Sequence, residues 1–210
     1  MKECVTVIDN KEYDAIISLG HNCQVASQLR RNHLRKFSGP LDWFNFAKTS
    51  EVCKVLQNRF EGFMLLENLE VYGKSQNCHY VRDKSTTCLS FHDFKNVTEE
   101  DPLFDYFIFR ETLDRRIRRF IDCLSSNKDI LLIRANVNST DSFDIYHAIK
   151  ETYSNPNVHF LFVNQSDEQQ IIEQPSTFKS INSLQIPSGK TWEGNYEAWK
   201  KVLSRFSLRR

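Results

Sequence analysis

The sequence predicts an α/β fold with three layers, α/β/α, in which helices cover both faces of a mainly parallel sheet. Residues 129–136, 141–154 and 158–164 read as strand, amphipathic helix and strand, a spacing typical of a parallel pair with a right-handed crossover. Both strands are continuous apolar runs, and such runs indicate strands that are buried on both faces. Residues 14–20 have the same character, so another strand of this kind is expected near the start of the chain.

The first strand is followed by a predicted helix over residues 24–31, where the apolar residues recur with helical periodicity. The apolar stripe of this helix contains Val25, Ala26 and Leu29. Asn22 is a good N-cap residue, which would place Cys23 in the first helical turn.

The middle of the chain is predicted to form a helix, an inserted antiparallel hairpin and a long helix. The first of these helices begins at Ser50, and the hairpin strands cover residues 77–83 and 86–94. Pro102 suits the first position of a helix, so the long helix is expected to open at that point. Four of its basic residues lie mostly off the apolar stripe and are interpreted as a solvated face: Arg115, Arg116, Arg118 and Arg119. A last helix is expected over residues 195–206.

The composition indicates one globular domain over residues 1–210. The hydrophobic fraction of 40% and the charged fraction of 26% are ordinary, and the net charge of +1 gives no reason to expect nucleic acid or anionic membrane as a partner. No segment is long and apolar enough to span a bilayer, and the first ten residues lack the apolar run of a signal peptide. We therefore expect a cytoplasmic protein with no nucleic-acid or membrane partner. Its six cysteines lack a paired motif and are expected to be free thiols.

Cys23 is the first candidate functional residue. A thiol in the first turn of a helix is close to free backbone N–H groups and to the positive end of the helix dipole. Both favour the thiolate, which is the nucleophilic form of cysteine. The alternative is that Cys23 is a small buried apolar residue, as most free cysteines are.

A cysteine nucleophile needs a base, and His92 is the preferred candidate because it stands at the end of the predicted hairpin. The neighbouring Asp93 is a candidate to orient the imidazole. In a regular strand, however, adjacent side chains point to opposite faces, so Asp42 and Asp83 are alternatives. The side chain of Gln24 and the backbone N–H of Cys23 are candidates for an oxyanion hole at the helix start.

Further polar residues follow the predicted parallel strands. In open α/β sheets, ligands bind outside the carboxyl ends of the strands, so Asn22, Gln24, Arg134 and Asn136 are candidates for substrate binding. An arginine at the end of a buried strand is costly unless it is paired with a carboxylate or bound to an anion. Structural pairing of Arg134 with Asp42 or Asp93 is the alternative to substrate binding.

The sequence gives no reason to expect a metal or another cofactor. Four possible zinc ligands lie close together in the chain, but their spacing matches no common zinc pattern: Cys78, His79, Cys88 and His92. Adjacent ligands in a strand would also point apart.

Three segments of the sequence stand out as motifs: SLGHNCQVA at residues 18–26, SGPLDW at 38–43 and SFHDF at 90–94. Together with the strand around Arg134, they resemble a family of mostly bacterial proteins described as papain-like cysteine peptidases. The resemblance implies that Cys23 is a nucleophile and His92 its base. A papain-type core has no obvious use for a parallel strand–helix–strand unit, so the strand pattern favours a flavodoxin-like or SGNH-hydrolase-like sheet instead.

Three functions are compatible with these observations. The first is a cysteine-dependent hydrolase or acyl transferase that acts on a small molecule or a peptide. The second is a transferase or binding protein for an anionic or nucleotide-linked ligand, held at the strand ends without thiol catalysis; no glycine-rich phosphate loop supports it. The third is an interaction module with a tryptophan-rich surface.

Overall fold

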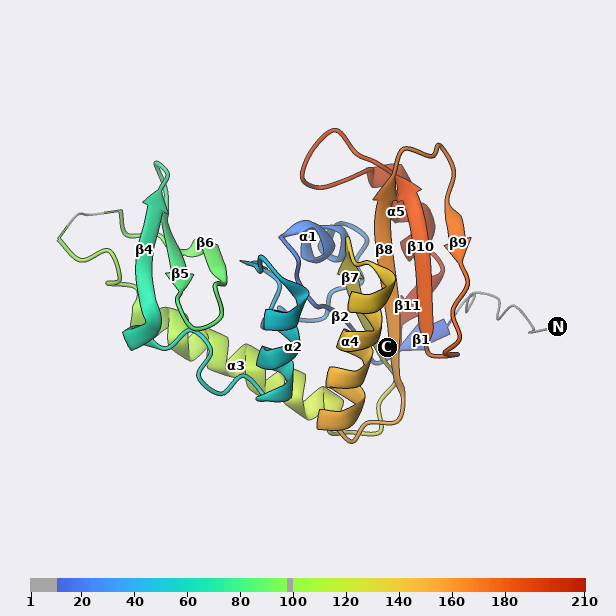
Figure 1. Cartoon of the computed structure of the whole chain (residues 1–210), viewed down its shortest axis with the longest axis horizontal. Coiled ribbons are helices and arrows are strands. Elements are labelled where there is room, and N and C mark those ends of the chain that lie inside the picture. The colour runs from blue at the N-terminus through green and yellow to red at the C-terminus, as the bar shows by residue number, and fades with distance from the viewer. Residues whose placement is uncertain (1–10, 98–99) are drawn as a thin grey trace.

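The computed structural model describes residues 11–97 and 100–210 and has a mixed α/β fold with parallel and antiparallel sheets (Figure 1). The main sheet has the strand order β2-β7-β8-β10-β9. Its first four strands in this order run parallel, and β9 pairs antiparallel with β10 at the edge. The strands are β2 (Ala15–Ser18), β7 (Ile130–Ala135), β8 (Val158–Ser166), β9 (Ile172–Gln174) and β10 (Ile181–Pro187).

Both faces of this sheet are buried, as the continuous apolar strands predict. Leu132 of β7 belongs to a core cluster shared with α2 (Thr49–Gln57), α3 (Tyr106–Leu124) and α4 (Ser139–Thr152). The adjacent Leu131 belongs to a second cluster shared with α1 (Gln24–Arg31) and α5 (Tyr196–Leu203). Successive strand residues point to opposite faces, so apolar residues at every position supply both cores.

A separate antiparallel sheet has the order β3-β6-β5-β4. Its strands are β3 (Phe44–Asn45), β4 (Leu69–Lys74), β5 (His79–Asp83) and β6 (Leu89–Phe94). The pairing of β5 with β6 confirms the predicted hairpin, whereas β3 and β4 extend it into a larger sheet. In Figure 1 this inserted sheet lies at the end of the molecule away from β9, and the long helix α3 runs from it toward the main sheet.

Short elements complete the described fold. β1 (Lys11–Tyr13) pairs in parallel with β11 (Phe206–Leu208), which joins the two ends of the described chain. A short 3-10 helix, η1 (Leu66–Asn68), precedes β4. No helix in residues 11–97 and 100–210 has both the length and the apolar character needed to cross a bilayer.

The bounds of α1 are as predicted, but its N-cap is Cys23 rather than Asn22. Two other helix starts differ from the predictions: α2 begins at Thr49, and α3 begins at Tyr106 rather than near residue 102. The late start of α3 has a local cause, because the Asp105 carboxylate accepts hydrogen bonds from the backbone N–H groups of Lys95 and Asn96 and thereby joins this corner to β6. The described strand order also places β2 at the edge of its sheet, whereas flavodoxin-like sheets place their first strand inside.

Candidate active site

The site begins at a sharp turn after β2. Gly20 has a positive φ of 75°, and a Cβ at this position would lie 2.9 Å from the carbonyl oxygen of Leu41. The next residue, His21, also has a positive φ, of 92°, which is uncommon for a residue other than glycine. The left-handed backbone at both positions reverses the chain within two residues and brings Cys23 to the start of α1.

At the start of α1, Asn22 supplies the side-chain acceptor that the sequence suggests, but the N-cap position belongs to Cys23. The side-chain oxygen of Asn22 accepts the backbone N–H of Gln24 at 2.8 Å, so Asn22 does satisfy a free N–H group of the first turn. Cys23 occupies the N-cap position, and its carbonyl oxygen accepts the N–H of Ser27 at 3.0 Å. The thiol therefore extends from the junction of the turn and the helix, one position earlier than predicted.

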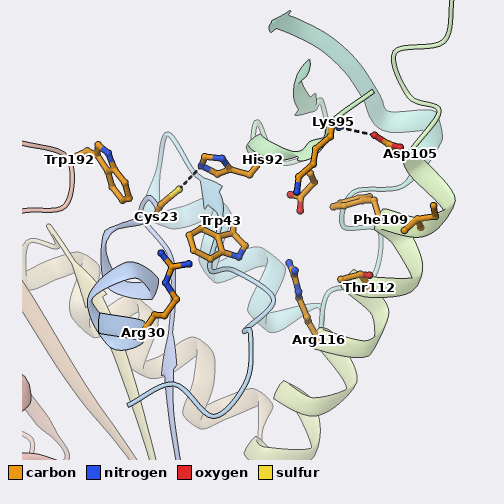
Figure 2. Close-up of a pocket in the computed structure, with 12 residues that line it drawn as sticks. Cys23, Arg30, Trp43, His92, Lys95, Asp105, Phe109, Thr112, Arg116 and Trp192 are labelled. Atoms are coloured by element: carbon orange, nitrogen blue, oxygen red, sulfur yellow. Dashed lines mark hydrogen bonds between the residues drawn. The ribbon is translucent and has the colours of Figure 1, made fainter. Parts of the chain in front are cut away.

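The structure brings Cys23 and His92 into contact, with 3.2 Å between Sγ and Nε2 (Figure 2). β3 makes this contact possible because it connects the two regions. Asn45 of β3 bridges His21 in the turn and also pairs with Leu89 of β6. His92 follows three residues later on β6, so the turn and the imidazole are held by one run of paired backbone.

β6 is irregular at the position of His92. His79 pairs with Phe94 and Val81 pairs with Ser90, so two steps along β5 correspond to four steps along β6. This bulge re-aims side chains, and His92 and Asp93 both line the same cavity. The expectation that they point to opposite faces is wrong because it assumes a regular strand. The Asp93 carboxylate accepts the Ser90 hydroxyl at 2.6 Å, and within the described residues no carboxylate hydrogen-bonds to His92.

The Cys23 cavity is the space of about 560 Å³ lined by Cys23, His92 and Asp93 together with parts of α1 and α3. Two tryptophans form walls beside the thiol, Trp43 and Trp192 (Figure 2). The Trp43 ring meets the His92 ring edge to face, with 5.9 Å between centroids. The cavity thus combines a thiol, an imidazole and large aromatic surfaces that a substrate can contact.

Polar residues on α1 hold the loop that carries Trp192. The side-chain amides of Gln24 and Gln28 donate to the carbonyl oxygens of Trp192 and Glu193 at 2.9 and 2.8 Å. The Glu193 carboxylate accepts further bonds from Ser27 and Arg31. The Gln24 side chain is fully buried in this contact and does not line the Cys23 cavity, so the structure does not place it for the predicted oxyanion hole.

The thiol at rest is neutral, contrary to the expectation from its position in the helix. Burial raises the pKa of Cys23 to about 11, and the charges of Asp93 and Asp42 add to this increase, while the cysteine's own backbone N–H opposes it. At neutral pH the proton therefore stays on sulfur until a base removes it. The nitrogen of His92 that contacts the sulfur is within hydrogen-bond distance of this proton.

Asp42 is buried away from the cavity and binds other partners. Its carboxylate pairs with Arg35 and accepts the backbone N–H of Gly39 at 2.9 Å. The guanidinium of Arg35 in turn lies over the Trp43 ring, 5.2 Å from its centroid. Asp42 therefore fixes the wall of the cavity and makes no contact with His92.

Arg134 and Asn136 lie elsewhere, in a second space of about 380 Å³ that also contains His21. We call it the Arg134 cavity. Arg134 is 1% exposed, and its Nη1 donates to the carbonyl oxygen of Leu19 at 2.5 Å, while its Nε has no hydrogen-bond partner among the described residues. Burial lowers the pKa of Arg134 to about 10. The suggested pairing with Asp42 or Asp93 is wrong, since these carboxylates bind Arg35 and Ser90.

Sequence reasoning missed several lining residues of the Cys23 cavity. Trp43 belongs to the SGPLDW motif, but its apolar character suggested only that it is buried. Arg116 is half-buried and lines the cavity, whereas the neighbouring Arg115, Arg118 and Arg119 are exposed, as predicted for a solvated face. In the part of the chain that the structure describes, no three His, Cys, Asp or Glu side chains are grouped to hold a metal ion.

Comparisons with known proteins agree with these motifs. Residues 14–164 match the model of a family described as "Putative papain-like cysteine peptidase (DUF1796)". The chain is 29% identical over 133 residues to "Uncharacterized protein R408" of Acanthamoeba polyphaga mimivirus. That alignment covers 56% of this chain and 60% of the viral protein, so the chain spans less than two thirds of its relative. No solved structure matches.

Proposed function

Because this chain belongs to the family described as papain-like cysteine peptidases, we propose that it is a cysteine-dependent hydrolase or acyl transferase. In this proposal Cys23 is the nucleophile and His92 its general base. The observation that carries the proposal is the 3.2 Å contact between the Cys23 sulfur and His92 Nε2 at the wall of a cavity. This separation is suitable for transfer of the thiol proton to the imidazole.

The reaction begins with a neutral thiol. As sulfur attacks the carbonyl carbon of the substrate, His92 Nε2 accepts the thiol proton and the carbonyl oxygen becomes an oxyanion. The tetrahedral intermediate collapses to a thioester on Cys23, and the imidazolium returns the proton to the leaving group. Water, or an acceptor in a transferase, then attacks the thioester while His92 takes its proton, and the Cys23 sulfur leaves and is reprotonated.

Asp93 is the best of the candidate acidic residues to assist His92. It lines the cavity with the imidazole, and its negative charge would stabilise the imidazolium as it forms. Asp42 is already bound to Arg35 and Gly39. The backbone N–H of Cys23 remains the candidate oxyanion donor, because the Gln24 side chain and backbone N–H have other partners.

The acyl substrate can be an amide, a thioester or an ester, in a small molecule or a peptide. The cytoplasmic location and the SGNH-hydrolase-like arrangement of the sheet stay predictions. A nucleophile after the first strand of a parallel sheet is compatible with this arrangement, since loops diverge at the strand ends.

The test is capture of an acyl-enzyme. The full chain is incubated with p-nitrophenyl acetate, and the modified residue is located by peptide mass spectrometry. We expect acetylation of Cys23 that disappears in Cys23→Ala and slows strongly in His92→Gln. Cys123→Ala is the matched control, because Cys123 is also a half-buried free thiol and lies outside the cavity.

A second readout does not require the correct acyl group. Iodoacetamide is expected to alkylate Cys23 faster than Cys123 at neutral pH, with a rate that depends on His92. Absence of an acetyl-enzyme together with equal alkylation of Cys23 and Cys123 would exclude a nucleophilic role for Cys23.

The Arg134 cavity supports a second candidate function, binding of an anionic or nucleotide-linked ligand without thiol chemistry. The specific observation is a buried guanidinium whose Nε has no hydrogen-bond partner in the described part of the chain, in a cavity that Asn136 and the start of α2 also line. Thermal shifts with phosphate, nucleotides and sugar phosphates test this function. If this function is correct, at least one compound raises the melting temperature of the wild type and of Cys23→Ala but not that of Arg134→Met. If none of these compounds changes the melting temperature of the wild type, the function is excluded.

A further inference from the structure

The Cys23 cavity contains more positive charge than its catalytic chemistry needs. Three cationic side chains line it from three different elements: Arg30 of α1, Arg116 of α3, and Lys95, which follows β6. In Figure 2 the guanidinium groups of Arg30 and Arg116 lie on either side of the Trp43 ring. In residues 11–97 and 100–210, none of these three side chains makes a hydrogen bond or an ion pair.

The carboxylates near these cations already have partners. Asp93 accepts the Ser90 hydroxyl at 2.6 Å, and Asp105 accepts two backbone N–H groups at 2.8 Å each. Burial raises the pKa of Asp42, the charge of Arg116 acts weakly in the opposite direction, and the Asp42 carboxylate is bonded to Arg35. Three cationic side chains against two carboxylates, Asp93 and Asp105, leave the lining of the cavity with a net positive charge.

From this arrangement we propose that the substrate of the Cys23 cavity is an acyl compound that carries a carboxylate or phosphate group, bound by Arg30 and Arg116. Guanidinium groups suit these anions because their planar N–H donors match pairs of acceptor oxygens. Trp43 and Trp192 contact the part of the substrate between the anion and the reacting carbonyl. This inference rests on the proposed function and adds to it the charge of the substrate.

The test uses two alkylating reagents of similar size and opposite character, the anion iodoacetate and the neutral iodoacetamide. Both form a carbon–sulfur bond at Cys23 and release iodide. The ratio of their rates at Cys23, measured by peptide mass spectrometry at low salt, reports the electrostatic potential at the sulfur. A change in thiolate fraction affects both rates alike and cancels in the ratio.

We expect the double variant Arg30→Gln, Arg116→Gln to lower the iodoacetate-to-iodoacetamide rate ratio by about threefold or more. The variant removes two positive charges that attract the anionic reagent to the sulfur but have little effect on the neutral one. Raising the salt concentration should lower the wild-type ratio in the same direction. Arg119→Gln is the matched control: it lies on the same helix, is exposed, and does not line the cavity, so its ratio should stay at the wild-type value.

A substrate pair provides a second measurement with the same variants. The p-nitrophenyl ester of succinate carries a free carboxylate, and the corresponding butyrate ester does not. Removal of Arg30 and Arg116 should raise KM for the succinate ester and leave KM for the butyrate ester nearly unchanged.

An unchanged reagent ratio in the double variant would overturn the inference. Failure of the proposed function has a different signature, namely that Cys23 reacts with iodoacetamide no faster than Cys123. The reagent ratio at Cys23 therefore tests the charge of the substrate, and the iodoacetamide rate of Cys23 relative to Cys123 tests the nucleophile, in the same experiment.

Discussion

The Cys23 cavity and the Arg134 cavity begin at the same turn but are built from different parts of the chain. Cys23 lines the first, and His21, two residues earlier, lines the second. The other polar groups of the Arg134 cavity lie at the carboxyl end of β7 or at the starts of α2 and α4. Those of the Cys23 cavity come from the inserted sheet, from α1 and from α3.

The usual rule for the position of ligand sites in α/β proteins applies to the Arg134 cavity but not to the Cys23 cavity. The rule that ligands bind at the carboxyl ends of parallel strands anticipates the grouping of His21, Arg134 and Asn136. It does not anticipate that the thiol faces away from this group toward an inserted antiparallel sheet. The positive φ values at Gly20 and His21 separate the two cavities, because they turn the chain between adjacent side chains.

The largest expected effect compares a histidine in each cavity. His92→Gln should slow acetylation of Cys23 by about 10²–10⁴-fold, the usual contribution of a general base. His21→Asn should change the rate by less than about threefold, because His21 lines the other cavity and asparagine tolerates a positive φ. Rates of p-nitrophenolate release measure both, and equal losses in the two variants would contradict the assignment of His92.

The next comparison concerns stability. Asp42→Asn leaves the half-buried Arg35 without its ionic partner and should lower the free energy of unfolding by about 3 kcal/mol. Asp144→Asn, at the exposed edge of the Arg134 cavity, should change it by less than about 0.5 kcal/mol. Urea denaturation followed by circular dichroism measures both values. A stable Asp42→Asn variant with lost acylation would instead indicate a direct catalytic role.

The pH dependence of thiol reactivity sharpens the description of the Cys23 cavity. Because burial and the charges of Asp93 and Asp42 raise the pKa of Cys23 to about 11, its alkylation by iodoacetamide in the His92→Gln variant, where no imidazole assists, should increase with pH and not level off until the most alkaline range. Asp93→Asn removes one of these charges and should move the midpoint lower by about one pH unit. A rate that is already constant between pH 6 and 9, a range typical of a preformed thiolate, would contradict this description.

The smallest expected effect concerns Arg134. Arg134→Met should change the free energy of unfolding by less than about 1 kcal/mol, because loss of the bond to Leu19 is offset by removal of a buried, partly unpaired cation. Thermal and urea denaturation measure this change. A loss comparable with that of Asp42→Asn would mean that the guanidinium is mainly structural.

Much of the fold could be predicted because strand and helix periodicity are local properties. The strand–helix–strand unit that ends in β8, the helix after β2 and the hairpin of β5 and β6 all follow from patterns within single segments. β3 could not be predicted, since its two residues form a strand only because Leu89 and Ser90 lie opposite them. The bulge in β6 was equally hidden, because it depends on the register with β5.

The amino-acid sequence by itself determined the two layers of apolar residues on the parallel strands, and it singled out Cys23 and His92 by their chemistry. Only the tertiary structure decided that they meet, that Asp93 lies beside them, and that Arg134 does not. The reason is physical: the identity of a side chain sets what it can donate or accept, but the pairing of distant backbone segments sets its neighbours. Those neighbours also determined the protonation of the thiol, since burial and two carboxylates outweigh the helix terminus that the local sequence displays.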